Sequence, residues 1–376
     1  MAIGCAAAVL GGALAACALV RRVHPADQPW RWEESRSEYL RRSRVWLGGD
    51  VDAWVRHVRS LDLRKGPPGR DAFVPEALVR CEYVRPPAGV ELGRTPKFLC
   101  RHRGANGDEV LKVKWGADNG EVFAEVVGTR LFWALGFPTD RMYPVRVECR
   151  GCPADPWQGG EYEAGSARRF EPAVVERPFP GETIEEFADQ GWTWAELMQV
   201  DVAAGGASRA ELDALSLLAA FVQHRDSKPG NQRLVCPPDE IGIDPDGRDD
   251  CGKPIALVQD LGSTLGGPAR LATHKMDLQA WREAPVWENP RRCVANLTSE
   301  ITATGGLERP VIGDEGRRLL SALLDALDDR QLRALFQVAR ADRRGGVSEW
   351  VGAFEKRRDA VRQPVPSEPG FRCPAS

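Results

Sequence analysis

The sequence lacks an excess of charge of either sign. Its 376 residues include 51 basic and 54 acidic side chains, without a long basic run. A nucleic-acid partner would call for Lys and Arg gathered on one surface, so nothing here indicates one. Histidine is also scarce, because the chain has five, dispersed along its length. That dispersal argues against a histidine metal cluster.

Internal repeats and low-complexity tracts are also absent. Gly and Pro are plentiful, at 38 and 28 residues, yet they are scattered between segments with periodic hydrophobicity. With 43% hydrophobic residues the chain can bury a sizeable core. Its length suits one bilobal domain or two ordinary ones.

Residues 1–20 carry no charged side chain and are rich in Ala, Gly, Val and Leu. Such a segment is typical of a targeting or membrane segment. Within it, Leu14-Ala15-Ala16-Cys17 resembles a bacterial lipobox, whose cysteine is lipidated after signal cleavage. Arg21 and Arg22 follow it, which by the positive-inside tendency favours a cytoplasmic globular part. We expect membrane association through the N-terminus, as an exported lipoprotein or as an inward-facing anchor.

The cysteines bear on the same question, because an even number in an exported chain permits disulfides. Cys236 and Cys251 bracket a Pro/Asp/Gly-rich excursion, and bridging them would close a hairpin. Cys149 and Cys152 form a single CxxC, and a zinc site would need a second ligand pair that the sequence does not reveal. We therefore expect structural thiols, free or bridged. Apart from Cys5 and Cys17, the cysteines are Cys81, Cys100, Cys149, Cys152, Cys236, Cys251, Cys293 and Cys373.

Hydrophobic periodicity divides the chain into a strand-rich part and a helical part. Residues 30–60 have helical spacing and predict a helical preface that packs on the main body. A helix with Phe123, Val126, Val127, Leu131 and Ala134 on its apolar stripe should end at Gly136. Alternation and turn residues predict four strands between about 90 and 180, covering 97–101, 109–115, 142–148 and 173–176.

Beyond residue 190 the pattern is mainly helical. One stripe, formed by Leu212, Leu215, Ala219 and Val222, leads directly into His224. Further helices are predicted near 313–342 and 347–362. The fold class that follows is α+β, with a small strand-rich lobe followed by a larger helical lobe.

The segment from His224 to Asn231 reads His-Arg-Asp-Ser-Lys-Pro-Gly-Asn, and Asp260 with Gly262 follows about thirty residues later. Phosphoryl transfer from ATP needs a carboxylate that accepts the hydroxyl proton and oxygen ligands that hold Mg²⁺ against the phosphates. Asp226 is the predicted base, and Asn231 and Asp260 are the predicted metal ligands. Lys228 is expected to steady the transferring phosphate.

The strand-rich part offers groups for binding the nucleotide. The segment from Gly93 to Phe98 includes Lys97, and its glycine would let backbone amides approach phosphates. Lys112 and Lys114 point to the same strand face because side chains alternate with period two. We prefer Lys112 as the phosphate-binding lysine, because Val110 then faces the adenine. If Lys114 had this role, a charged side chain would face the adenine. Glu125 is its expected partner, with Glu121 as the alternative.

The stretch from Val174 to Phe187 suits a hinge between the two lobes. Backbone groups near Glu176 to Pro178 would meet the adenine edge, with apolar neighbours over its faces. His224 is interpreted as a structural residue of the loop.

In this order, Gly-x-x-Pro-Lys, Val-Leu-Lys, Glu125 and the Asp-x-x-x-x-Asn loop resemble the HipA-like branch of atypical kinases, which share the fold of the phosphatidylinositol kinases. The resemblance covers roughly residues 90–265. It implies a protein-kinase-like fold, ATP, Mg²⁺ and transfer of the γ-phosphoryl group to a hydroxyl, usually on a protein. The wording His-Arg-Asp is closer to ordinary protein kinases, and the N-terminus is unlike that of the cytoplasmic HipA toxins. The alternative is an inactive pseudokinase that acts as a membrane-tethered nucleotide-binding scaffold.

The expected organisation has five parts. They are a signal or anchor (1–22), a helical extension (23–88), a kinase-like N-lobe (89–178), a kinase-like helical C-lobe (179–365) and a flexible tail (366–376).

Overall fold

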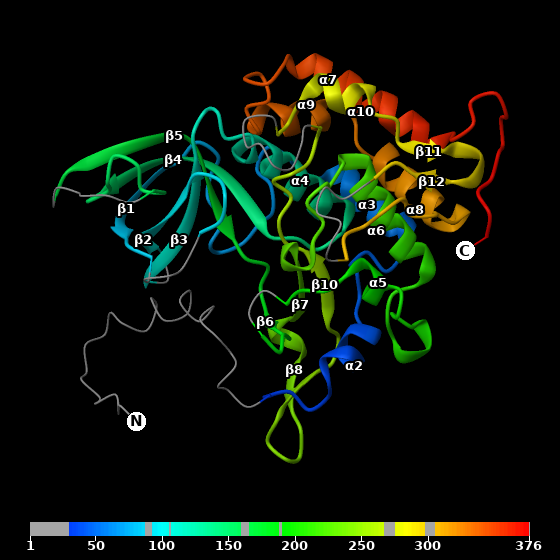
Figure 1. Cartoon of the computed structure of the whole chain (residues 1–376), viewed down its shortest axis with the longest axis horizontal. Helices are drawn as coiled ribbons and strands as arrows, with labels where there is room; N and C mark the ends of the chain where they lie inside the picture. The colour runs from blue at the N-terminus through cyan, green and yellow to red at the C-terminus, as the bar shows by residue number, and fades with distance from the viewer. Residues whose placement is uncertain are drawn as a thin grey trace.

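A computed structural model describes residues 30–86, 92–104, 107–158, 165–187, 190–266, 275–297 and 305–375. The leader and lipobox predicted in residues 1–22 lie outside these ranges. Mixed α and β structure is observed, as expected (Figure 1). No helix in the described ranges is both long and apolar enough to cross a membrane.

Five strands close into a barrel in the order β1-β2-β3-β5-β4. All neighbouring pairs are antiparallel except β1 with β4, which run parallel. The barrel has an apolar interior of its own, in which Phe98, Tyr143 and Phe170 pack together. Its strands are β1 (Leu78–Val84), β2 (Lys97–Gly104), β3 (Gly107–Trp115), β4 (Arg141–Arg150) and β5 (Ala167–Arg177).

The four strands predicted from alternation are confirmed, each somewhat longer than expected. β1 is additional, and it places the start of the barrel before residue 89, where the sequence suggested the strand-rich part begins. A period-two signal was present there, since Val79 and Cys81 are buried while Arg80 and Glu82 are exposed.

Helix α4 (Glu121–Leu135) packs against the barrel on one side and the other helices on the other. Almost every side chain of this helix is buried, which suits a helix enclosed on all sides. It ends at Gly136 as predicted, where φ is +87°. A Cβ atom at this glycine would lie 2.7 Å from Nε1 of Trp46, so the close approach of the preface also requires glycine.

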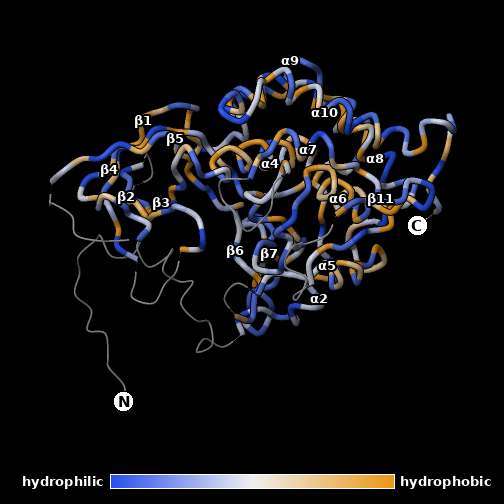
Figure 2. Tube along the Cα trace, turned by 45° about the horizontal axis from the view of Figure 1, so that its top comes forward, coloured by the Kyte–Doolittle hydropathy of each residue, from blue (hydrophilic) through white to orange (hydrophobic). Residues whose placement is uncertain are grey.

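The large hydrophobic core lies among the helices and takes in the preface. In Figure 2, hydrophobic segments gather along α4 and α6 (Arg209–Val222). The preface consists of α2 (Arg36–Arg41) and α3 (Val51–Ser60), and Tyr39 and Val58 are fully buried in that core. The expected packing of residues 30–60 on the main body is thus confirmed. The remaining helices are α5 (Trp194–Leu197), α7 (Leu278–Glu283), α8 (Asp314–Asp325), α9 (Asp329–Val338) and α10 (Val347–Arg362).

Short strands interrupt the part predicted to be mainly helical. A three-stranded sheet has the order β10-β7-β6, and two hairpins are formed by β8 with β9 and β11 with β12. The strands are β6 (Glu182–Thr183), β7 (Gln232–Cys236), β8 (Ile241–Ile243), β9 (Asp249–Cys251), β10 (Ile255–Val258), β11 (Trp287–Asn289) and β12 (Val294–Ala295).

Within the described residues, four disulfides link these elements. The Cys236–Cys251 bridge, which the sequence left open as a way to close a hairpin, is formed. The tail that we expected to be flexible is tied down, because Cys373 is bridged to Cys293 and its backbone N–H donates to Asp314. The other bridges join Cys81 to Cys100 and Cys149 to Cys152, both in the barrel.

Candidate active site

Charged side chains from the barrel, α4, the turn after β10 and the segment before α7 meet in one group, which we call the lysine–carboxylate cluster. All its members are buried except Asp260, whose side chain is 28% exposed. Opposite charges are paired throughout it, as burial of charge requires. Its members are Lys97, Lys114, Lys275, Glu121, Glu125 and Asp260.

The register of β2 and β3 places Lys97 directly opposite Lys114. Two like charges at such a position repel each other. Glu121 lies between them, with Oε2 at 3.8 Å from Nζ of Lys97 and 3.6 Å from Nζ of Lys114. Thr95 adds a hydrogen bond of 2.7 Å to the same carboxylate oxygen. One carboxylate therefore lies between the two lysines and reduces their repulsion where the two strands meet α4.

Of the two lysines on β3, Lys114 is the one that reaches Glu125 of α4. Its Nζ donates to Oε1 of Glu125, one turn after Glu121 on the same helix face, and lies 3.7 Å from Oδ2 of Asp260. Burial opposes the charge on Lys114, yet Asp260, Glu125 and Glu121 outweigh it and hold its pKa well above the ordinary value. Lys114 thus stays protonated at neutral pH.

Lys112 does not meet Glu125, so the expected pair of these two residues is wrong. Lys112 faces Glu176 directly across the β3–β5 pair, and the two side chains form an ion pair of 2.6 Å. The sequence placed both lysines on one strand face, but only the position of α4 decides which of them its carboxylates reach. Glu176, expected at the hinge, is buried at the end of β5 and uses its side chain to pair Lys112.

The turn with Asp260 is shaped to lie against α4. The backbone N–H of Gly262 donates to Oδ1 of Asp260 at 2.8 Å. A Cβ atom at Gly262 would lie 2.8 Å from Cγ of Glu121 and 3.0 Å from Oε1 of Glu125, so any larger residue would push these carboxylates away. Although burial raises the pKa of Asp260, Lys114 and Lys97 hold it well below its usual range. Asp260 is therefore ionised.

Two further cluster members have pKa values displaced by their surroundings. Burial raises the pKa of Glu125, and the positive charge of Lys114 opposes that rise. Burial and the neighbouring Lys114 lower the pKa of Lys97 to about 8. Groups with such shifts concentrate at functional sites, although structural ion pairs produce them too.

The segment from His224 to Asn231, which we call the 224–231 loop, adjoins the Asp260 turn through the backbone. The N–H of Arg225 donates to Ser263, and the N–H of Gln259 donates to Asn231, at 3.1 and 2.8 Å. The side-chain amide nitrogen of Asn231 donates to the carbonyl of Asp226 at 2.5 Å. That bond leaves the amide oxygen as the end of Asn231 that can bind a cation.

Asp226 and Lys228 lie together on this loop. Nζ of Lys228 is 3.1 and 3.0 Å from the two carboxylate oxygens of Asp226. The Asp226 side chain is 18% exposed and that of Lys228 39% exposed, so both can be reached from solvent. His224, by contrast, is fully buried, and burial lowers its pKa to about 4 against the attraction of Asp226 and Asp260. It is a neutral packing residue, as interpreted from the sequence.

The predicted phosphate loop faces the cluster at Lys97. Gly93 has φ of +98°, and a Cβ atom there would lie 3.2 Å from Nζ of Lys97. Its carbonyl accepts a hydrogen bond of 3.1 Å from Nε1 of Trp157. Gly93 and Lys97 are therefore neighbours in space.

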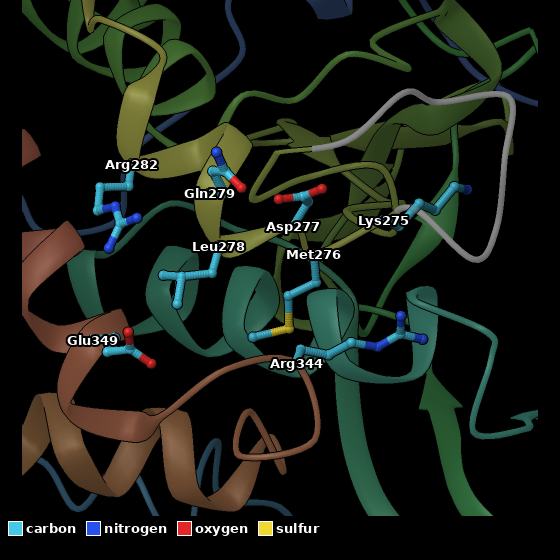
Figure 3. A pocket seen from close by; sticks show the side chains of 8 residues that line it. All are labelled: Lys275, Met276, Asp277, Leu278, Gln279, Arg282, Arg344 and Glu349. Carbon is cyan, nitrogen blue, oxygen red and sulfur yellow. The ribbon is translucent and has the colours of Figure 1, made fainter.

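Lys275 is a cluster residue that no sequence signal revealed. It donates to Oε1 of Glu121 from a position 154 residues away in the chain. Lys275 also borders a 360 Å³ pocket, where it and Arg344 lie at one end and Arg282 and Glu349 at the other (Figure 3). The guanidinium of Arg344 stacks over Phe123 of α4, 5.0 Å from the ring centre. Both cations thus connect the pocket to the first turn of α4.

The donor set fits a hard divalent cation. Asp260 and Asn231 offer carboxylate and amide oxygens, which Mg²⁺ prefers. The backbone N–H of Asp260 donates to the carbonyl of Asn231 at 3.3 Å, and Nζ of Lys114 lies 3.7 Å from the Asp260 carboxylate. Lysines next to such oxygens can hold phosphate groups. The arrangement can therefore bind an anionic phosphate ligand together with a divalent metal.

No family model and no curated protein matches the chain. A solved structure to which it is similar is that of CtkA, a proinflammatory kinase of Helicobacter pylori, at 10% sequence identity and a TM-score of 0.41. The match covers 77% of this chain and 99% of that one. It is a distant likeness to a kinase.

Proposed function

We propose that the protein is an ATP- and Mg²⁺-dependent phosphotransferase, an atypical kinase that moves the γ-phosphoryl group to a hydroxyl on a protein. The observation that carries the proposal is the meeting of Lys114, Glu125 and Asp260, drawn from the barrel, α4 and the turn after β10. Phosphoryl transfer depends on this kind of lysine–glutamate pair beside a metal-binding aspartate. In this proposal the barrel and the helical part are the two lobes of a HipA-like kinase fold.

Each residue has a role set by its contacts. Glu125 orients Lys114 toward the α- and β-phosphates, and Lys97 with Gly93 binds the phosphates from the strand-end loop. Asn231 and Asp260 would hold Mg²⁺, which would offset the negative charge of the phosphates. Asp226 accepts the proton of the attacking hydroxyl, and Lys228 stabilises the negative charge of the phosphoryl group during transfer. Lys112 and Glu176 line the end of β5, near the adenine.

The acceptor hydroxyl belongs to a Ser or Thr of a protein in the leading form of this proposal, ahead of lipids and small molecules. The protein is membrane-associated through residues 1–22. It has no nucleic-acid partner in this proposal, because its charge is balanced at 51 basic and 54 acidic residues.

A second candidate function is nucleotide binding without transfer, as a membrane-tethered scaffold. It is favoured by the disulfides, since such bridges persist in oxidising compartments. ATP is scarce outside the cytoplasm, where these compartments lie. An inward-facing anchor therefore goes with the phosphotransferase, and an exported lipoprotein goes with the scaffold.

Transfer of radiolabelled γ-phosphate to protein acceptors, with and without Mg²⁺, tests the proposal. We expect transfer by the wild-type protein, and a loss of about a thousandfold in Asp226→Ala with nucleotide binding retained. The Asp260→Ala variant should require a far higher Mg²⁺ concentration than the wild-type protein for measurable phosphate transfer. Equal transfer by wild type and Asp226→Ala would remove Asp226 as the base. A nucleotide-dependent rise in melting temperature without transfer would favour the scaffold.

A further inference from the structure

Two of the disulfides lie against each other inside the barrel. The Sγ atoms of Cys81, Cys100 and Cys149 all lie within 4.8 Å of one another, and Cys152 is bonded to Cys149. All four side chains are buried. Over the described ranges, neither of the other two bridges belongs to such a group of three ligands.

Strand register explains why these cysteines meet. Cys81 on β1 is directly opposite Cys149 on β4. On the other side, Cys81 is opposite His102, two residues from Cys100 on β2, so the two cysteines share one face of the sheet. The turn at Gly151, with φ of +64°, then brings Cys152 back to Cys149. Three neighbouring strands therefore bring three sulfurs together, and one tight turn bonds the fourth to Cys149.

We propose that, when both disulfides are reduced, Cys81, Cys100, Cys149 and Cys152 bind one zinc ion through four thiolates. A CxxC pair together with a second cysteine pair is the ligand set of structural zinc sites. The sequence showed only the CxxC. The barrel supplies the missing pair, because it places Cys81 and Cys100 beside Cys149.

The chemistry balances with a dithiol as reductant. Two disulfides take up four electrons and four protons and become four thiols, while two dithiol molecules become disulfides. Zinc then displaces the four thiol protons, so metal binding releases protons and is stronger at higher pH. The bound centre carries two net negative charges. Arg168, directly opposite Cys149 in the β4–β5 pair, donates from Nε to the carbonyl of Cys152 at 3.2 Å and places a cation beside it.

A zinc ion would also link more of the fold than the short bridge does. The Cys149–Cys152 disulfide joins residues three apart, so it restricts the unfolded chain far less than the Cys293–Cys373 bridge, whose residues are 80 apart. Four thiolates on one metal would instead tie β1, β2 and β4 together.

The full chain, produced in a reducing cytoplasm with zinc and kept in a thiol-free reductant, tests the proposal. After dialysis against a competing chelator we expect one zinc per chain by elemental analysis. Zinc should slow alkylation of the four barrel cysteines at least tenfold, while the four cysteines of the other bridges react equally with and without zinc. Mass spectrometry of the labelled peptides distinguishes the two sets.

Variants make the assignment residue by residue. The double variant Cys100→Ser, Cys152→Ser should retain less than a tenth of the wild-type zinc, while Cys236→Ser, Cys251→Ser should retain all of it. The single variant Cys152→His, which keeps a zinc-binding side chain, should still bind zinc, and its cobalt-loaded form should have an altered absorption spectrum. If the reduced wild-type protein holds no stoichiometric zinc, or if zinc protects none of the four thiols, the site does not exist. The protection experiment needs no variant, so misfolding of a mutant cannot obscure the answer.

Discussion

The lysine–carboxylate cluster and the 224–231 loop both carry the charges of the candidate site, but they hold them differently. Lys114 and Glu125 are almost fully buried, and each cluster charge is balanced by another side chain. Asp226 and Lys228 remain partly exposed on a loop that is fixed through backbone hydrogen bonds. A buried charge depends on its partner for the stability of the fold, whereas an exposed pair contributes little. The cluster should therefore be needed for folding and binding, whereas the Asp226–Lys228 pair of the loop should be needed for chemistry alone.

The largest expected effect is the removal of Lys114. In Lys114→Met the carboxylates of Glu125 and Asp260 lose their shared cation in a buried site, and we expect the free energy of unfolding to fall by about 3–5 kcal/mol. Urea denaturation measures this change. Phosphate transfer should be lost as well, because no other lysine reaches Glu125 in the described structure.

The matched control is Lys112→Met on the same strand face. Lys112 is 21% exposed and forms an ion pair with the hinge-side carboxylate Glu176. We expect a smaller loss than in Lys114→Met, of about 1.5–3 kcal/mol, because Lys112 is partly solvated while Glu176 loses a charged partner. If Lys112→Met abolishes transfer while Lys114→Met retains it, the phosphate-binding lysine has been assigned to the wrong residue.

The sequence predicted the elements better than the partners within them. Alternation located β2 to β5, and the apolar stripe with Gly136 located α4, because such patterns reflect local burial. The choice between Lys112 and Lys114 depends on the position of α4 and on the residue opposite each lysine on β5. Both are properties of the tertiary structure. Period two puts both lysines on one face, and the sequence contains nothing further that distinguishes them.

Two other features depend on contacts between distant segments. Lys275 reaches Glu121 across 154 residues and follows no motif that would mark it. The pairing of Cys81 with Cys100 requires β1, whose alternation went unrecognised within the expected helical extension. In the helical part, β6, β8, β9, β11 and β12 have only two or three residues, too few for alternation to show. β7 and β10 are buried along their whole length, so their side chains do not alternate between buried and exposed.

A second prediction concerns His224, which belongs to the loop in sequence but is buried like the cluster. The folded protein keeps this imidazole neutral down to about pH 4, whereas the unfolded chain takes up a proton near pH 6.5. Between these values the unfolded state binds more protons. Stability is therefore present above pH 6.5 and is lost as pH falls toward 4, by about 2–3 kcal/mol in total.

Urea denaturation at pH 7.5 and pH 4.5 measures that loss. In His224→Asn, which does not titrate, the difference between the two pH values should shrink by about 2–3 kcal/mol relative to wild type. His57→Asn serves as the control, because His57 lies on the exposed face of α3. An unchanged pH difference in His224→Asn would show that the buried histidine is not the source of the acid sensitivity.

The smallest expected effect is on the loop itself. The Asp226 carboxylate is paired with Lys228, whose side chain is more than a third exposed, so Asp226→Asn should change the free energy of unfolding by less than about 0.5–1 kcal/mol. A double-mutant cycle with Lys228→Ala measures the coupling between the two residues, which should stay below about 1 kcal/mol. A coupling as large as that between buried partners would mean that Asp226 is a structural charge like those of the cluster. Asp226 would then also be needed for folding, and a loss of phosphate transfer in Asp226 variants could no longer be attributed to the missing base.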